Sequence, residues 1–136
     1  MHVLDEPMLK ARSWIAELAN DLGVDEQRAW LCLRAGLHAL RDRLSVDEAA
    51  QLGAQLPLIV RGLWYEGWHP AHKPLHLRTR AELFERIHQG LSGVPESPAL
   101  IARALFRLLD RHVTEGEIAK VRHVLPEDLQ QLWRGA

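Results

Sequence analysis

The sequence predicts an all-α protein built from two similar helical halves, and three observations support this fold class. The stretch RAGLHALRDRLSVDEAAQLGAQLPLIVRGLW (residues 34–64) aligns without a gap with residues 103–133 at a shift of 69 positions, and nine of the 31 aligned positions are identical. Apolar residues recur at helical spacing in both halves, and no segment shows the alternation of a strand. Helix-start signals stand at corresponding places. An internal repeat of this kind indicates two pseudo-symmetric units of three to four helices each, packed into one compact bundle.

The first repeat is expected over about residues 7–66, and its first helix over about residues 7–22. Asp5 is in position to cap the start of this helix, and Pro7 is tolerated in a first turn because the N–H that it lacks has no helical partner there. Gly23 supplies the C-terminal stop.

The second helix carries the most regular apolar pattern in the chain. Asp25 is expected to cap its start, and an apolar seam follows at alternating steps of three and four residues: Trp30, Leu33, Leu37, Leu40 and Leu44. Arg34, Arg41 and Asp42 fall opposite this seam, which predicts a solvated face. We expect the seam to meet the corresponding helix of the second repeat near a pseudo-twofold axis.

Two short helices are expected to complete the first repeat. The third begins at a capping box of Ser45 and Glu48, in which each side chain accepts a hydrogen bond from the backbone N–H of the other residue. Its buried side is expected to hold Val46, Ala49, Leu52, Gly53 and Leu56. Pro57 starts the fourth helix, which should end near Gly67, and Gly62 within it is interpreted as a point of close helix approach.

The second repeat, over about residues 79–134, follows the same plan. Capping boxes are expected at residues 79–82 and 114–117, and Ser97 is expected to cap a helix that begins at Pro98. This helix has a broad apolar face, formed by Ile101, Leu105, Phe106, Leu108, Leu109 and Val113. Glutamate and aspartate after Pro126 favour a helix start there, because the helix dipole stabilises anions in the first turn.

The linker between the repeats, about residues 67–78, contains prolines and a glycine that exclude a continuous helix. His69, His72 and His76 within it are the candidate metal ligands, because imidazole binds zinc, copper and nickel and three histidines could form an open site. Prolines interrupt their spacing, and no cysteine or carboxylate follows at ligand distance. An exposed, unliganded cluster is therefore the alternative interpretation.

Two aromatic residues at the junction of the first repeat and the linker are the candidate interaction residues. Tyr65 and Trp68 have no counterpart in the second repeat, and aromatic residues are enriched in interface hot spots. Trp64 and Trp133, in contrast, occupy equivalent positions in the two repeats. A role that recurs with the repeat favours packing rather than a unique site.

Composition restricts the function classes. The 136 residues, 47% hydrophobic and 26% charged, fit a single domain over residues 1–136 whose halves share a core. A net charge of −1 provides no field that would attract nucleic acid or an anionic membrane, and no apolar run is long enough to span a bilayer. The row of Arg103, Arg107 and Arg111 is interpreted as a solvated ladder among acidic neighbours. Cys32 is the only cysteine, which is compatible with a cytoplasmic location.

The sequence shows no catalytic constellation, because a phosphate-binding glycine loop and the GxSxG, HExxH and CxxC patterns are all missing. We therefore expect neither an enzyme nor a cofactor. The leading hypothesis is a non-catalytic module that binds another protein or itself, a homodimer being one form of the latter. The alternative is a small-ligand or metal-binding protein that uses the cleft between the repeats and the histidines of the linker.

Residues 56–68, LPLIVRGLWYEGW, together with HALRDRL at 38–44 and FERI at 84–87, resemble the bacterial family called domain of unknown function 2267. The resemblance covers nearly the whole chain, from the first helix to Trp133. It implies a duplicated helical fold in one domain and a cytoplasmic protein of a bacterium. The family has no assigned activity, so the resemblance implies no catalytic or cofactor-binding residues.

Overall fold

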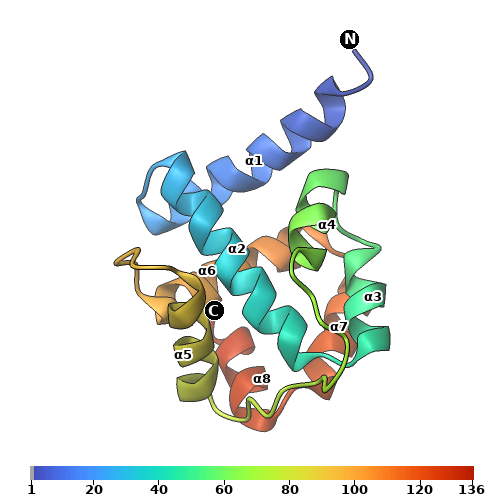
Figure 1. Ribbon diagram of the computed structural model, residues 1–136, viewed down its shortest axis with the longest axis vertical. Coiled ribbons are helices and arrows are strands. Elements are labelled where there is room, and N and C mark those ends of the chain that lie inside the picture. Colours follow the sequence, from blue (N-terminus) through green and yellow to red (C-terminus); the bar gives the residue numbers. More distant parts are fainter. Residues whose placement is uncertain (1) are drawn as a thin grey trace.

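A computed structural model describes residues 2–136, and Figure 1 shows its fold. The described residues form eight α-helices and no strand, which confirms the predicted class. None of these helices is both long and apolar enough to cross a lipid bilayer. The helices are α1 (Asp5–Leu22), α2 (Glu26–Arg43), α3 (Val46–Gly53), α4 (Leu58–Tyr65), α5 (Arg80–Gly90), α6 (Pro98–His112), α7 (Glu115–Val124) and α8 (Glu127–Arg134).

The helices of the two halves correspond in order and position. Adding the shift of 69 to Val46 and Leu58, the first residues of α3 and α4, gives the first residues of α7 and α8. Pro57 and Pro126 are the N-caps of α4 and α8, with φ and ψ of −60° and 155° in the first and −57° and 154° in the second. The helix bounds thus follow the repeat in the sequence, whereas the symmetry of the two halves in space stays a prediction.

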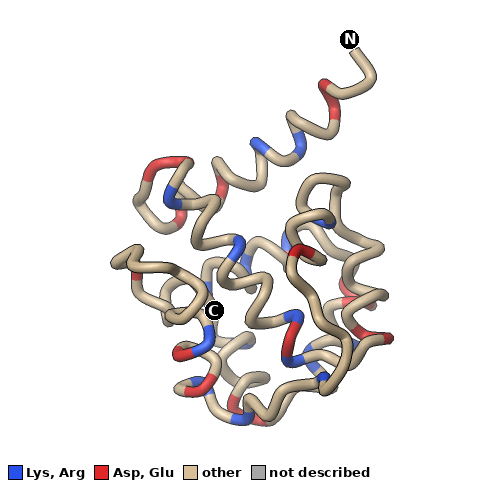
Figure 2. The backbone as a smooth tube through the Cα atoms, viewed as in Figure 1, with Lys and Arg blue, Asp and Glu red and all other residues tan. Residues whose placement is uncertain are grey.

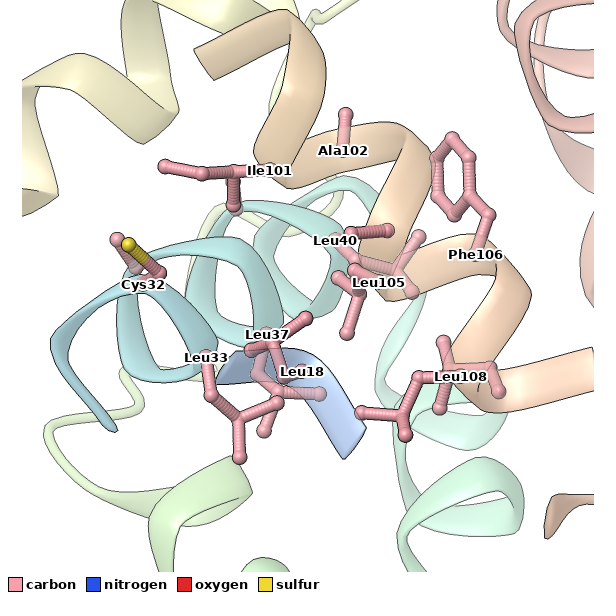
Figure 3. Packing of buried hydrophobic residues seen from close by; sticks show 14 of the residues in the cluster. Leu18, Cys32, Leu33, Leu37, Leu40, Ile101, Ala102, Leu105, Phe106 and Leu108 are labelled. Atoms are coloured by element: carbon pink, nitrogen blue, oxygen red, sulfur yellow. The ribbon is translucent and has the colours of Figure 1, made fainter. Parts of the chain in front are cut away.

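The core lies where α1, α2 and α6 meet. Figure 3 shows side chains of α2 and α6 gathered on one another, with Leu18 of α1 beside them. The largest fully buried side chains include Leu37 and Phe106, together with Trp64 and Trp133 from the ends of α4 and α8. The Phe106 and Trp133 rings stack with centroids 4.2 Å apart. Trp64 and Trp133 therefore have the packing role that their equivalent positions indicate.

Two helices approach each other closely at Gly36, but not at Gly62. A Cβ atom at Gly36 would lie 3.1 Å from Leu105 Cδ2 and 3.4 Å from Ile101 Cγ2, so α2 and α6 approach each other at this glycine. Gly62 is exposed, and a Cβ atom there would meet nothing within 4 Å. The interpretation of Gly62 from the sequence was wrong, because its side of α4 faces solvent rather than another helix.

The buried side of α2 is wider than the predicted seam. Four seam leucines are buried, but Trp30 is 36% exposed because the buried face centres on smaller residues, among them Ala29, Cys32 and Gly36. The prediction that Arg41 and Asp42 are solvated was wrong, since α5 and the linker cover that side of the helix.

Side-chain caps confirm most of the predicted helix starts. The backbone N–H three positions on donates to each of Asp25, Ser45, Thr79 and Ser97, and Gly23 ends α1 with a φ of 69°. Asp5 is not a cap: it is the first residue of α1, and Leu4 precedes it without a side-chain bond. Val46, expected to be buried, is 42% exposed, because the buried side of α3 is formed one turn later by Ala49, Leu52 and Gly53.

The capping box expected at residues 114–117 is only half formed. The Glu117 N–H donates to Thr114 Oγ1 at 3.3 Å, as expected. The reciprocal bond is missing, because the Thr114 N–H donates instead to Gln55 Oε1 at 3.3 Å. Gln55 belongs to the turn between α3 and α4, so the first repeat reaches into the start of α7.

Candidate functional site

A buried charged pair fastens the end of α4 to α2. Arg41 Nε donates to Asp42 Oδ1 at 2.9 Å, and the two side chains are only 5% and 4% exposed. Arg41 Nη1 also donates to the carbonyl oxygens of Trp64, at 3.0 Å, and Glu66, at 2.7 Å. These bonds satisfy carbonyl groups that the end of α4 would otherwise leave unpaired.

Asp42 joins this pair to the rest of the molecule. Arg86 of α5 donates to Asp42 Oδ2 at 2.9 Å, and the backbone N–H of Leu75 in the linker donates to the carbonyl oxygen of Asp42 at 2.8 Å. Burial opposes ionisation of the Asp42 carboxyl, but hydrogen bonds from Arg41 and Arg86 outweigh it and lower its pKa. Both carboxylate oxygens are occupied, so this network is a structural clamp rather than an acid or base available for chemistry.

His38 and Glu66 lie beside the clamp. His38 Nε2 donates to the carbonyl oxygen of Leu63 at 2.7 Å, and burial lowers the pKa of the imidazole despite this bond. Arg34 binds Glu66, and the hydrogen bond between them lowers the pKa of that carboxyl. These polar groups likewise hold α2 to the end of α4.

The two predicted interaction residues pack against each other. The Tyr65 and Trp68 rings have centroids 5.5 Å apart and planes inclined by 49°, and both residues are half-buried. Trp68 Nε1 is buried and makes no hydrogen bond to any residue among 2–136. Tyr65 covers the side of α3 at Gly53, where a Cβ atom would fall 2.5 Å from Tyr65 Oη, and Trp68 packs against the hydrophobic core. Part of each ring is therefore used within the fold.

The three histidines of the linker do not come together as a metal site. His69, His72 and His76 are all exposed, in the irregular stretch of residues 66–79. Across the described part of the chain, no group of three or more His, Cys, Asp or Glu side chains could hold a metal ion. Cys32 is buried, which raises the pKa of its thiol to about 11.

Two arginines of the basic row on α6 are paired with α1. Arg107 Nη2 lies 2.9 Å from Asp21 Oδ1, and Arg111 Nε lies 2.9 Å from Glu17 Oε1. Burial opposes ionisation of Glu17, but hydrogen bonds from His112 and Arg111 lower its pKa. These pairs join the two repeats and agree with the interpretation of the row as a surface ladder.

The feature that sequence reasoning missed is the protruding half of α1. Figure 1 shows the N-terminal half of this helix extending beyond the other helices. Ala11, Ile15 and Leu18 form the buried stripe of the C-terminal half. Leu4 and Met8 continue this stripe at the same helical spacing, yet they are 58% and 56% exposed. The apolar stripe of residues 4, 8, 11, 15 and 18 can be recognised in the sequence. The sequence does not show how far along α1 the other helices cover this stripe.

A groove of about 710 Å³ separates the protruding half of α1 from the corner between α3 and α4. One wall is formed by one side of α1 with Val3 before it, and the other by residues 54–58 and Arg61; His112 also lines the groove. Leu58 on the second wall is 63% exposed. Arg61 is not free to bind an anion there, because its guanidinium donates to the carbonyl oxygens of Gly53, Ala54 and Leu56.

Charges on the protruding half of α1 are segregated along the helix. Figure 2 shows acidic positions nearest the N-terminus, followed by basic ones. Asp5 and Arg12 are seven residues apart, so they lie on the same flank of the apolar stripe, two turns from each other. Asp5 accepts the His2 N–H at 2.8 Å, and Arg12 forms no ion pair with any residue among 2–136. Arg12 is therefore available to an acidic group outside the chain.

Comparison with known proteins supports the resemblance described above. Residues 11–132 match the model of the family described as "Uncharacterized conserved protein (DUF2267)". No curated protein matches the chain.

Proposed function

The chain belongs to the uncharacterized conserved family DUF2267, and from this premise we propose that it is a non-catalytic self-association module. Two copies pair through the protruding halves of their α1 helices, antiparallel to each other. The observation that carries this proposal is the uncovered continuation of the buried stripe at Leu4 and Met8. Exposed apolar surface that continues a buried helix face is typical of an interaction site.

Charge complementarity supports a second copy as the partner. In an antiparallel pair related by a twofold axis, Asp5 of each helix faces Arg12 of the other, and Met8 of each packs beside Met8 of the other. A parallel arrangement would instead set like charges against each other. The same surface thus complements itself, as a twofold interface requires.

The dimer should be weak and reversible. Only the N-terminal half of each α1 projects from the body, which offers less surface than stable dimers bury. Ion pairs on the flank of the contact are exposed, so added salt should weaken the association. A module of this kind suits regulated or avidity-driven assembly rather than a permanent dimer.

Sedimentation velocity over a series of protein concentrations tests the proposal. We expect a monomer–dimer equilibrium that shifts to monomer in Met8→Glu, because a charge would be placed in the apolar contact. Leu100→Glu is the matched control, since Leu100 of α6 is 55% exposed, close to the 56% of Met8, and does not line the groove beside α1. It should leave the equilibrium unchanged.

A charge exchange tests the orientation of the two helices. Arg12→Asp should weaken the dimer, because two acidic groups then face each other on each flank. The double variant Asp5→Arg/Arg12→Asp should restore it. A wild-type protein that stays monomeric up to its solubility limit would rule out self-association, and a double variant no better than Arg12→Asp would rule out the antiparallel pairing.

A bacterial cytoplasmic location remains part of this proposal. It is supported by a single, fully buried cysteine, which needs no oxidising compartment. The alternative metal-binding role lacks support, because the three linker histidines do not gather.

A further inference from the structure

A buried carboxylate in α7 lacks the partner that its counterpart in the first repeat has. Glu48 accepts the Ser45 N–H at 2.9 Å and so completes its capping box. Glu117, the equivalent residue, is 7% exposed, and its Oε2 is buried without a hydrogen bond from any described residue. Gln55 occupies the Thr114 N–H in its place. Buried carboxylates are costly unless a donor satisfies them, so an unpaired one calls for an explanation.

Glu117 lines a pocket of about 570 Å³ between the C-terminal end of α3 and the first turns of α7. This volume lies within the range of small-molecule sites, which is about 300–1,000 Å³. The α3 side contributes Gln51 and Gln55, and the α7 side contributes Thr114 and Lys120. The pocket is therefore built by both repeats, and both sides contribute side chains that can donate or accept hydrogen bonds.

The charges of the lining define the class of ligand. Glu117 supplies one negative charge, and Lys120, one turn further along α7, supplies one positive charge. Lys120 is exposed and forms no ion pair within residues 2–136. A purely cationic or purely anionic ligand would match one of these groups and be repelled by the other. A ligand with an amine at one end and a carboxylate at the other matches both.

We propose that this pocket binds a small zwitterion of amino-acid size, with its ammonium group donating to Glu117 and its carboxylate facing Lys120. No residue of α1 lines this pocket, and only Ala54 and Gln55 are shared with the groove beside the protruding half of that helix. This inference therefore does not rest on the proposed self-association.

The test is a titration of the full-length, ¹⁵N-labelled protein, followed through the backbone signals of Thr114 and Gly116. The probes are 4-aminobutyrate, which carries both charges, propylamine, which carries only the amine, and butyrate, which carries only the acid. We expect 4-aminobutyrate to shift these signals saturably and to bind more tightly than either single-charge probe. No shift with any probe, or butyrate binding as tightly as 4-aminobutyrate, would overturn the proposal.

Paired variants assign the binding to Glu117. Glu117→Gln should weaken 4-aminobutyrate binding by about tenfold or more, because it removes a charge-assisted hydrogen bond. Glu48→Gln is the matched control, since that carboxylate serves its own capping box, and it should bind like the wild type. Equal losses in both variants would show a general effect on the fold and would contradict the site.

A steric variant keeps the test decisive if Glu117→Gln disturbs folding. Gly116 lines the pocket, and a Cβ atom there would meet nothing within 4 Å. Gly116→Leu should block the pocket without a loss of stability, because leucine has a higher helix propensity than glycine. Retained 4-aminobutyrate binding in a folded Gly116→Leu variant would place the ligand elsewhere and overturn the proposal.

Discussion

Replacing Asp42 by asparagine should show how much the clamp between α2, α4 and α5 contributes to the free energy of unfolding. The substitution keeps the shape of the side chain but removes its charge. Arg41, only 5% exposed, would lose its anion and retain the carbonyl oxygens of Trp64 and Glu66. Arg86 would lose its contact with the same group, but its side chain is 40% exposed.

The exposed fractions of the Arg41 and Arg86 side chains determine how much stability each substitution should remove. Breaking a buried ion pair by removing one partner costs about 3–5 kcal/mol, because the remaining charge is left uncompensated. The carbonyl oxygens that still accept from Arg41 reduce this cost, so we expect about 2–4 kcal/mol for Asp42→Asn. Arg86→Gln removes only the exposed arm of the network, and an exposed ion pair contributes about 0–1 kcal/mol.

The assay is urea unfolding of the wild type and both variants at neutral pH, followed by circular dichroism. Asp42→Asn should lower the free energy of unfolding clearly more than Arg86→Gln does. Equal losses in the two variants would refute the assignment of the main stabilisation to the buried arm of the clamp. An unchanged unfolding midpoint in Asp42→Asn would refute the clamp altogether.

The stability difference between the wild type and Asp42→Asn should also depend on pH, in a direction that the pKa of Asp42 determines. The pKa of Asp42 in the folded protein lies below its ordinary value of about 3.9. A carboxyl of this kind contributes stability that is fully present above the unfolded-state pKa and is lost as the pH falls through the folded-state pKa. The deficit of Asp42→Asn relative to the wild type should therefore shrink below about pH 4. A deficit that stays constant down to strongly acidic pH would contradict the role of the charge.

Two further predictions concern the helix packing. Gly62→Ala should raise stability by up to about 1 kcal/mol through helix propensity, whereas Gly36→Ala should lower it, because the new methyl group crowds Leu105 Cδ2 at 3.1 Å. Thermal unfolding of the two variants measures both effects. A larger gain in stability at Gly36 than at Gly62 would contradict the close approach of α2 and α6. Leu40→Ala and Leu109→Ala, at equivalent buried positions, should each cost about 2–5 kcal/mol in chemical denaturation. A neutral result for either would contradict the shared core.

The helix starts could be predicted because they depend on residues close in the chain. The capping residues Asp25, Ser45, Thr79 and Ser97 all bond the N–H three positions on, and such contacts form whatever the rest of the molecule does. The expected box at residues 114–117 failed in one bond only. Gln55, which accepts the Thr114 N–H in place of Glu117, is 59 positions away in the sequence. Capping signals among neighbouring residues therefore do not reveal it.

The candidate sites were harder to predict because they depend on what covers a helix. Tyr65 and Trp68 are aromatic and near each other, but part of each ring is buried within the fold. The histidines of the linker carry the right chemistry for a metal site without converging. In contrast, Glu117 was explained as a cap, and only its unpaired Oε2 beside a pocket marks it for another role.

The sequence by itself determined the helical class, the order of the helices and the duplication, because periodicity and capping are written into neighbouring residues. Only the tertiary structure decided which charged groups are buried and which apolar ones are left uncovered. Arg41 is hidden because segments 23 and 25 residues further along the chain accept its hydrogen bonds. Met8 is exposed because the N-terminal half of α1 extends beyond the other helices. Burial is a property of the assembled elements, and helical spacing specifies a face without specifying its partner.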